Sequence, residues 1–180
     1  MRFDRGPAAV AAMLVVLLGL VGCAKKAPLT RSSEVLTANS LEELVSNSDA
    51  VISGAVINVE PGRVVGEAAP EQLTQLSVRV DRVMFGSLTT DVVLVEESSG
   101  IPTETSQVGQ SGIFFLHLKD DNQDVPYYRL VSSQGRFIER SETVVPSNNQ
   151  APWVKELERM TPPEFEKAVA DAIASTSAAE

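Results

Sequence analysis

The polar and apolar side chains of residues 76–85, LSVRVDRVMF, alternate, but the alternation slips by one position part-way along. The apolar positions are even-numbered as far as Val80 and continue at Val83 and Phe85. An extra residue near Asp81, held in a β-bulge, would return both sets to one face, so that Val80 and Phe85 both point inward. Bulges bend strands, and a small closed barrel needs a long bent strand that continues from one side of the barrel to the other.

Five other segments have the alternation or the β-branched and aromatic content of strands. They are residues 51–59, 91–97, 112–118, 127–132 and 135–140. In the first of these, the odd-numbered apolar residues are expected to share one face, and a turn signal at residues 133–135 predicts that the last two segments form a hairpin. Six strands in roughly 110 residues indicate a mainly β fold, a small antiparallel barrel of the OB type.

Two helices are expected beside the barrel. Ser40 begins the first, where Glu43 completes a capping box that satisfies backbone donors at a helix start. Thr161 and Glu164 repeat this motif before an amphipathic stretch near the end of the chain. The folded domain is therefore predicted to span residues 40–175, an OB-like barrel with a short N-terminal helix and a C-terminal helix.

The start of the chain is built like a secretory signal. Arg2 and Arg5 supply positive charge, residues 8–21 are uncharged and mostly apolar, and Gly22 is a small residue directly before the only cysteine, Cys23. The apolar run is too short for a helix that spans a membrane, which needs about 20 such residues. An ordinary signal peptide and a buried apolar helix are the alternative interpretations.

Residues 20–23, Leu-Val-Gly-Cys, resemble the lipobox of bacterial lipoproteins, in which the cysteine receives a diacylglycerol and becomes the mature N-terminus. The resemblance implies a signal peptide over residues 1–22, cleavage between Gly22 and Cys23, and a lipid on Cys23. That lipid would anchor the protein to the extracytoplasmic face of a cell membrane. Residues 23–39, which are mostly polar and small after the cysteine, would then form the lipidated end and a flexible tether.

Charge and cysteine content limit what the mature chain can do. Removing residues 1–22 leaves 158 residues (180 minus 22) with 13 Lys and Arg against 23 Asp and Glu, a net charge of −10 compared with −9 for the whole chain. Such an acidic chain is unsuited to nucleic acid, whose phosphates require a basic surface. With Cys23 acylated no thiol is left for a disulfide, so the fold must be stable on its core alone, as a chain of about 150 residues can be.

Three segments in order resemble the tissue-inhibitor-of-metalloproteinase and netrin-like modules, whose barrel is an OB-fold. They are SDAVISGAVI, then LSVRVDRVMFG with DVVLVEE, then VGQSGIFFLHL, and the similarity spans residues 48–139 as a pattern of strands. Those modules carry disulfides, which a chain with one cysteine lacks. The inhibitors also chelate the zinc of their target through a free N-terminal cysteine placed against the barrel. An acylated Cys23 at the end of a tether could not do so, and this mechanism does not carry over.

No catalytic constellation emerges from the sequence. Residues 109–112, GQSG, resemble the G-x-S-x-G motif of a nucleophile elbow, but the second glycine comes one position too early. His117 is the only imidazole and lies in an apolar strand, so a structural or half-exposed histidine is favoured over a general base. There are too few histidines and thiols for the common zinc sites. We therefore expect a protein that is not an enzyme and needs no cofactor.

One acidic loop resembles a metal-ligand set. Asp120, Asn122 and Asp124 have the spacing of the first three ligands of a calcium loop, but Val125 replaces the glycine and Val131 the bidentate glutamate. A solvated acidic loop is the favoured interpretation, and a weak calcium site is the alternative.

A binding surface is the remaining prediction. OB barrels bind ligands on the face of their second and third strands, beside the loops that join strands one to two and four to five. The first of these loops is predicted at residues 60–72, where Arg63 precedes Val64 and Val65, and Arg79 lies on the outward side of the bent strand. These four residues are the predicted contact site, with a mobile insertion and a solvated arginine as the alternative.

The function expected from these observations is a non-catalytic binding module, anchored in the cell envelope, for a protein or peptide partner. The alternative is a structural or accessory subunit of a larger envelope complex.

The lipid anchor can be tested directly. Two acyl chains hold a protein stably on a membrane whereas one holds it only marginally, so diacylation should place the native protein in the membrane fraction. The Cys23→Ser variant should be released or remain unprocessed. Fractionation followed by mass spectrometry of the N-terminus measures both outcomes, and soluble native protein with an unmodified cysteine would contradict lipidation.

Overall fold

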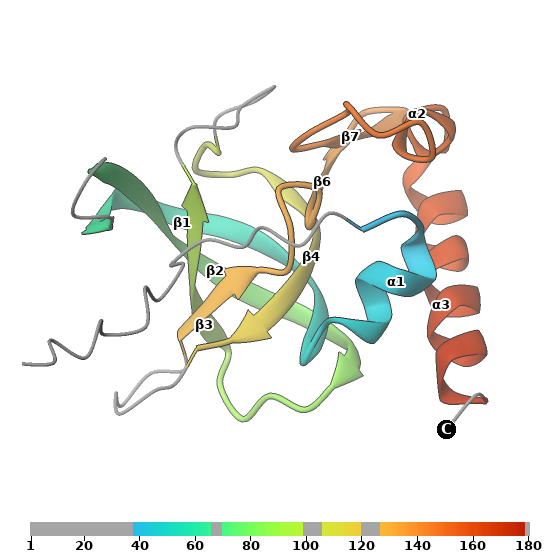
Figure 1. Ribbon diagram of the computed structural model, residues 1–180, viewed down its shortest axis with the longest axis horizontal. Coiled ribbons are helices and arrows are strands. Elements are labelled where there is room, and N and C mark those ends of the chain that lie inside the picture. Colours follow the sequence, from blue (N-terminus) through green and yellow to red (C-terminus); the bar gives the residue numbers. More distant parts are fainter. Residues whose placement is uncertain (1–37, 66–69, 99–105, 120–126, 179–180) are drawn as a thin grey trace, which may run out of the picture. The chain divides into compact units, whose positions relative to one another are not determined.

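The computed structural model describes residues 38–65, 70–98, 106–119 and 127–178. Its elements in chain order are α1 (Leu41–Ser46), β1 (Ala50–Val65), β2 (Glu71–Gly86), β3 (Val92–Ser98), β4 (Ser111–Leu118), β5 (Tyr127–Leu130), β6 (Arg136–Arg140), β7 (Thr143–Pro146), α2 (Val154–Leu157) and α3 (Pro162–Ser177) (Figure 1).

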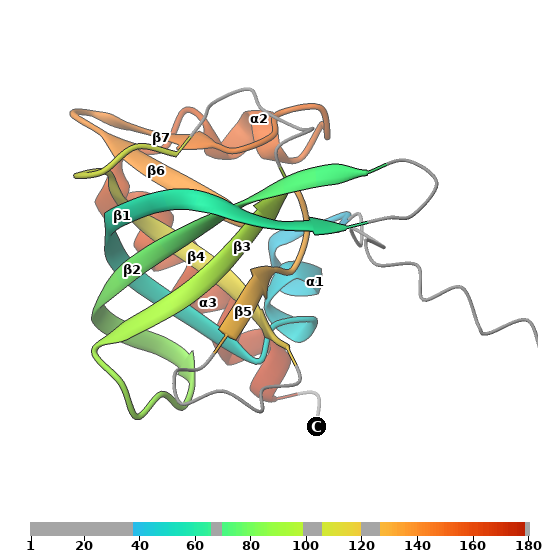
Figure 2. The same ribbon diagram turned by 90° about the vertical axis from the view of Figure 1, so that its left-hand side faces the viewer.

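Five strands close into a barrel in the order β1-β2-β3-β5-β4, with β4 pairing back to β1. Neighbouring strands are antiparallel except β3 and β5, which are parallel. Figure 2 shows β1 and β2 as long curved strands that wrap around the barrel. Strands β6 and β7 extend the sheet from β4. The predicted fold, a mainly β OB-like barrel with a short N-terminal helix and a C-terminal helix, is confirmed.

The inside of the barrel is filled by apolar side chains from its five strands and from β6. The buried members of this interior core are Ala50, Ile52, Val56, Leu76, Val78, Val93, Val95, Phe114, Leu116, Tyr128 and Ile138. Most come from alternate positions of their strands, as expected where one face points inward. Each large aliphatic side chain buried in this way stabilises the fold by about 1.5–3 kcal/mol.

A second core, which we call the helix-side core, packs three helices against the wall formed by β1, β4 and β6. Phe137 of β6 is its centre: its ring meets Phe115 of β4 edge-on at 5.9 Å between centroids and Phe165 of α3 at 4.6 Å. Val51 belongs to this core, whereas Ile52 beside it belongs to the interior core. Strand β1 is therefore buried on both faces.

The predicted bulge in β2 is confirmed. Ser53 pairs with Arg82 while Gly54 pairs with Val80, so Asp81 is the extra residue on β2. The bend that follows lets β2 continue along β1 at the other side of the barrel.

The prediction that Phe85 shares the inward face of Val80 is wrong. A second shift makes Met84 another extra residue, because Phe85 pairs with Val51 and Val83 with the next residue of β1. Phe85 packs against the helix-side core, whereas Val80 packs against the interior core. Two bulges within a few residues turn the strand twice, so one correction of the alternation does not give the right face.

The predicted loop at residues 60–72 is also mostly strand. Residues 57–65, which we call the β1 extension, pair with β2 and, within the described part of the chain, with no other strand. Ile57 is an extra residue at its start. This bulge explains why Val59 packs against the interior core while Val51 faces the helices, contrary to the common face predicted for residues 51–59.

The predicted hairpin between residues 127–132 and 135–140 does not form. Strands β5 and β6 instead pair with successive parts of the same edge of β4. The backbone of Phe115 bonds to both Val131 and Gly135, at 3.0 and 2.8 Å. The predicted turn is present, because the N–H of Gly135 donates to the carbonyl of Ser132 at 2.9 Å, but it does not pair β5 with β6.

Two glycines face each other where β1 meets β4. A Cβ atom at Gly54 would lie 2.4 Å from the carbonyl oxygen of Arg79, and one at Gly112 would lie 2.1 Å from that of Phe137. No side chain fits at these distances, so Gly54 is required for β2 to approach β1, and Gly112 is required for β6 to approach β4.

The predicted helix starts are confirmed. The Ser40 hydroxyl accepts the Glu43 N–H at 3.2 Å, although the Glu43 carboxylate accepts from Asn39 (2.8 Å) rather than from the cap residue itself. At α3 the Glu164 carboxylate accepts from the N–H (2.9 Å) and hydroxyl (2.8 Å) of Thr161.

The helix-side core predicts different costs for two phenylalanines. Phe137→Ala should lower the free energy of unfolding by about 3–5 kcal/mol, because a fully buried ring between two others is lost. Phe85→Ala, at the partly exposed margin of the same core, is the matched control and should cost less. Urea denaturation followed by circular dichroism measures both. Equal costs would show that Phe137 is not central.

Candidate functional site

Four side chains from four strands form a row across the outer face of the barrel. The strand register pairs Gln75 of β2 with Glu96 of β3, Glu96 with Arg129 of β5, and Arg129 with His117 of β4. In each strand, a residue next to the member of this row belongs to the interior core. Because successive side chains of a strand point to opposite faces, the row faces outward. Side chains directly opposed on neighbouring strands lie about 5 Å apart at Cβ.

Two further residues lie beside this row on the same face. Lys119 is two positions beyond His117, and Tyr127 is two positions before Arg129. The N–H of Lys119 donates to the carbonyl of Tyr127 at 2.9 Å, which keeps the two residues together. Arg63, from the β1 extension, reaches the row from the other side.

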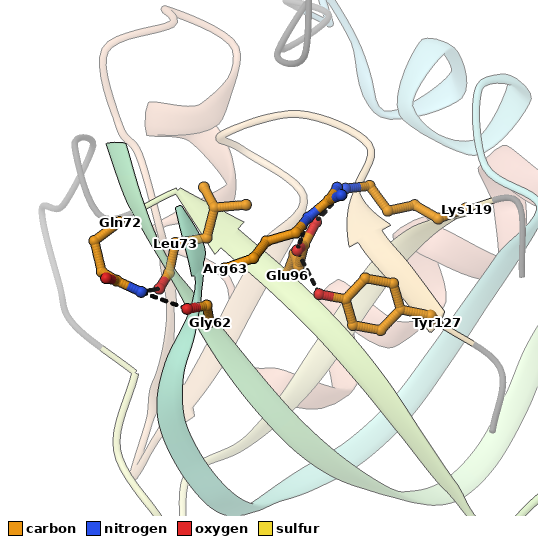
Figure 3. Close-up of polar contacts among 7 residues, drawn as sticks. All are labelled: Gly62, Arg63, Gln72, Leu73, Glu96, Lys119 and Tyr127. Atoms are coloured by element: carbon orange, nitrogen blue, oxygen red, sulfur yellow. Dashed lines mark hydrogen bonds and ion pairs between the residues drawn. The ribbon is translucent and has the colours of Figure 1, made fainter. Parts of the chain in front are cut away.

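Glu96 is the centre of these contacts (Figure 3). Arg63 donates from Nε to Oε1 at 2.6 Å and from Nη2 to Oε2 at 3.1 Å. Lys119 donates to Oε2, and the hydroxyl of Tyr127 donates to Oε1. The Glu96 side chain is only 2% exposed, whereas that of Arg63 is 55% exposed. We call these four residues the Glu96 cluster.

The Glu96 cluster shifts the ionisation of its members. Burial disfavours the charged carboxylate of Glu96, but the hydrogen bonds from Arg63, Lys119 and Tyr127 outweigh it and lower its pKa. Burial, together with the hydrogen bond to Glu96, raises the pKa of Tyr127. The hydrogen bond to Glu96 likewise raises the pKa of Arg63. The cluster is thus held as one carboxylate between two cations and a neutral phenol.

His117 is oriented by a second carboxylate. Its Nδ1 lies 2.8 Å from Oδ2 of Asp49, which also accepts the N–H of Leu118 at 2.8 Å. The His117 side chain is 44% exposed, so the predicted half-exposed strand histidine is confirmed. With Nδ1 engaged, Nε2 is the nitrogen left for other partners.

An open groove of about 620 Å³ lies over these side chains. It is lined by Arg63, Gln75, His117, Leu118, Lys119, Tyr127 and Arg129. Among the described residues no side chain pairs with Arg129. Within the described part of the chain, the groove therefore holds one cation without a counter-charge.

The neighbouring glutamate has a different role on the inner face. Glu97 accepts from Arg136 at 2.7 and 2.8 Å and from the Ser106 hydroxyl at 2.6 Å. The Arg136 side chain is buried, and it joins β6 to β3. Since this ion pair is away from the solvent, its role is structural.

The predicted contact residues do not form one surface. Arg63 lines the groove, and Val64 beside it is 59% exposed, but the side chain of Val65 lies outside the described part. Arg79 is exposed and pairs with Asp81 at 3.1 Å. Val64 pairs with residue 72 of β2, seven positions from Arg79, which corresponds to about 20 Å along a strand.

Other predicted sites fall on residues that the structure does not describe. Gly22 and Cys23 lie before the first described residue, and Asp120, Asn122 and Asp124 lie between β4 and β5. Within the described ranges, no three His, Cys, Asp or Glu side chains are placed to hold a metal ion. No helix of these ranges has the length and apolar character to cross a membrane.

Sequence reasoning missed the centre of the groove. Glu96 lies 23 positions before Lys119 and 31 before Tyr127, and the parallel pairing of β3 with β5 brings it beside Tyr127 and Arg129. The one available indication is a pair of consecutive glutamates at the end of an apolar strand, since alternation sends one of them to each face.

Comparisons with known proteins add no assignment. No protein-family model matches this chain, and no curated protein is significantly similar to it.

Glu96 predicts a pH dependence of stability. Its pKa is lower in the folded protein than in the unfolded chain, so its stabilising effect is complete above the unfolded value of about 4.5 and is lost as the pH falls through the folded pKa. At pH 7, Glu96→Gln should destabilise the protein by about 2 kcal/mol, through weaker hydrogen bonds to Arg63 and Lys119.

Thermal melts between pH 7 and pH 3 measure this effect. The difference between the wild type and Glu96→Gln should shrink as the pH falls, because the protonated wild-type carboxyl resembles the amide. Glu142→Gln, at an exposed position, is the isosteric control. A difference that stays constant with pH would contradict the role given to Glu96.

Proposed function

We propose that this protein is a lipid-anchored, extracytoplasmic binding module without catalytic activity, and that the groove beside the Glu96 cluster receives a protein or peptide of the cell envelope. The lipobox-like residues 20–23 and the apolar run before them support the anchor. The observation that carries the binding role is the groove itself, which is open, about 620 Å³ in volume and contains Arg129, a cation that no described side chain pairs with.

The position of the groove supports the same proposal. It lies beside β3 and next to the β1–β2 hairpin, and OB barrels use this part of the barrel for their ligands. Glu96 fixes the side chains of Arg63, Lys119 and Tyr127, so these polar groups are held in place before a ligand arrives.

The polar groups of the groove favour binding over catalysis. His117 and Asp49 form an oriented pair, but no serine, threonine or cysteine is among the described residues that line the groove. The Tyr127 hydroxyl is engaged by Glu96, and its raised pKa makes it a poor nucleophile.

The β1 extension favours a second candidate, an accessory subunit of a larger envelope complex. Ile57 and Val64 are 43% and 59% exposed on this segment. Its edge away from β2 has no strand partner within the described residues. An exposed strand edge with apolar side chains can pair with another chain.

Partner capture from membranes tests the proposal. The intact lipoprotein should capture a partner that the Cys23→Ser form captures less well. Arg63→Ala and Val64→Ser should lower capture if the groove and the adjoining extension bind it, while a loss confined to Arg79→Ala would place the contact on β2 instead. The melting temperature of each variant is measured first, so that a loss of capture is not mistaken for unfolding.

Undiminished capture by all three variants would contradict the proposed site. The lipid-free protein separates the two candidates, because a binding module should be monomeric on a sizing column, whereas an obligate subunit should self-associate through its exposed apolar residues.

A further inference from the structure

Among the described residues, the groove beside the Glu96 cluster carries more positive charge than Glu96 neutralises. Arg63 and Lys119 share the single charge of Glu96, and Arg129 adds another cation without a partner among the described residues. The chain as a whole has a net charge of −9. A local excess of positive charge on an acidic protein is complementary to an anionic ligand.

The side chains at the centre of the groove suit a carboxylate. A guanidinium such as that of Arg129 presents parallel N–H donors that match the two oxygens of a carboxylate. His117, directly opposite Arg129 in the register, has Nε2 left after Asp49 has engaged Nδ1. This nitrogen donates to a carboxylate when the ring is protonated and accepts a peptide N–H when it is neutral.

The remaining walls suit a short peptide better than a polyanion. Leu118 is 42% exposed and the ring of Tyr127 lines the groove, so apolar groups beside the carboxylate can be covered. Gln75 offers an amide that can pair with a peptide backbone. A polyanion such as a nucleic acid needs a long basic surface, and an acidic chain repels it.

We infer that the groove binds an acidic peptide segment and that Arg129 is the residue that holds its carboxylate. This inference rests on the proposed binding function and specifies the chemistry of the ligand. Arg63 and Lys119 act indirectly, because Glu96 fixes them at the edge of the groove.

A defined peptide tests the inference. Fluorescein-labelled Leu-Glu-Glu-Leu with blocked ends is titrated with the purified full-length protein at low salt, and binding is followed by fluorescence anisotropy. Blocked Leu-Gln-Gln-Leu of the same length is the uncharged control. The glutamate peptide should bind at least about tenfold more tightly, as the loss of charge-assisted hydrogen bonds implies.

Two substitutions locate the contact. Arg129→Gln should weaken binding of the glutamate peptide by about tenfold and leave the glutamine peptide unchanged. Arg159→Gln removes the same charge at an exposed position that does not line the groove, and it should have no effect. If Arg129→Gln melts at a lower temperature, Arg129→Lys gives the second test, because it keeps the charge but loses the bidentate geometry and should bind with intermediate affinity.

Several outcomes would overturn the inference. Equal binding of the two peptides, or equal weakening by Arg129→Gln and Arg159→Gln, would exclude a carboxylate on Arg129. Stronger competition by inorganic tripolyphosphate than by unlabelled glutamate peptide would assign the groove to phosphates. If capture from membranes persists while the glutamate peptide does not bind, the binding function stands and only the ligand chemistry is wrong.

Discussion

Strand β1 hydrogen-bonds to β2 along one edge and to β4 along the other, and the barrel is closed only because both edges are used. Gly54 and Gly112 face each other at this junction, and the absence of a side chain at each lets β2 approach β1 and β6 approach β4 on their other edges. The closure also places Ile52 in the interior core and Val51 in the helix-side core. The three helices therefore cover a wall whose position is set by the barrel, and Phe137 with Phe165 fixes α3 on it.

Two adjacent glutamates on β3 form ion pairs that join β3 to other strands of the sheet. Glu97 is bound inside by Arg136 of β6, and Glu96 is bound outside by Arg63 of β1 and Lys119 at the end of β4. A buried carboxylate is tolerated only with cations and hydrogen-bond donors around it, so each glutamate requires side chains from strands that are distant in sequence. The outer glutamate thereby holds two basic side chains at the rim of an open groove.

Local patterns were sufficient to predict most of the fold. Alternation identified β1 to β6, although not β7 or the end of β1 beyond residue 59. Capping motifs identified α1 and α3, and a single slip identified the bulge at Asp81. The second bulge could not be predicted, because Met84 and both of its neighbours are apolar and hide the slip. The groove could not be predicted either, except for Arg63, because the alignment of Glu96 with Arg129 arises from a parallel pairing that leaves no local trace.

The barrel topology also determines when the groove can exist during folding. The β1–β2 and β2–β3 pairings are local, but the closure pairs Ala50 with Leu116, 66 positions further along (116 minus 50). Pairings of this separation carry a larger loop entropy and form late. The groove lies over β2, β3, β5 and β4 and uses none of the β1–β4 pairs; its longest-range pairing joins β3 to β5, with Leu94 opposite Tyr127, 33 positions further along (127 minus 94). The polar walls can therefore meet before β1 pairs with β4, and the binding site is separate from the contacts that complete the barrel.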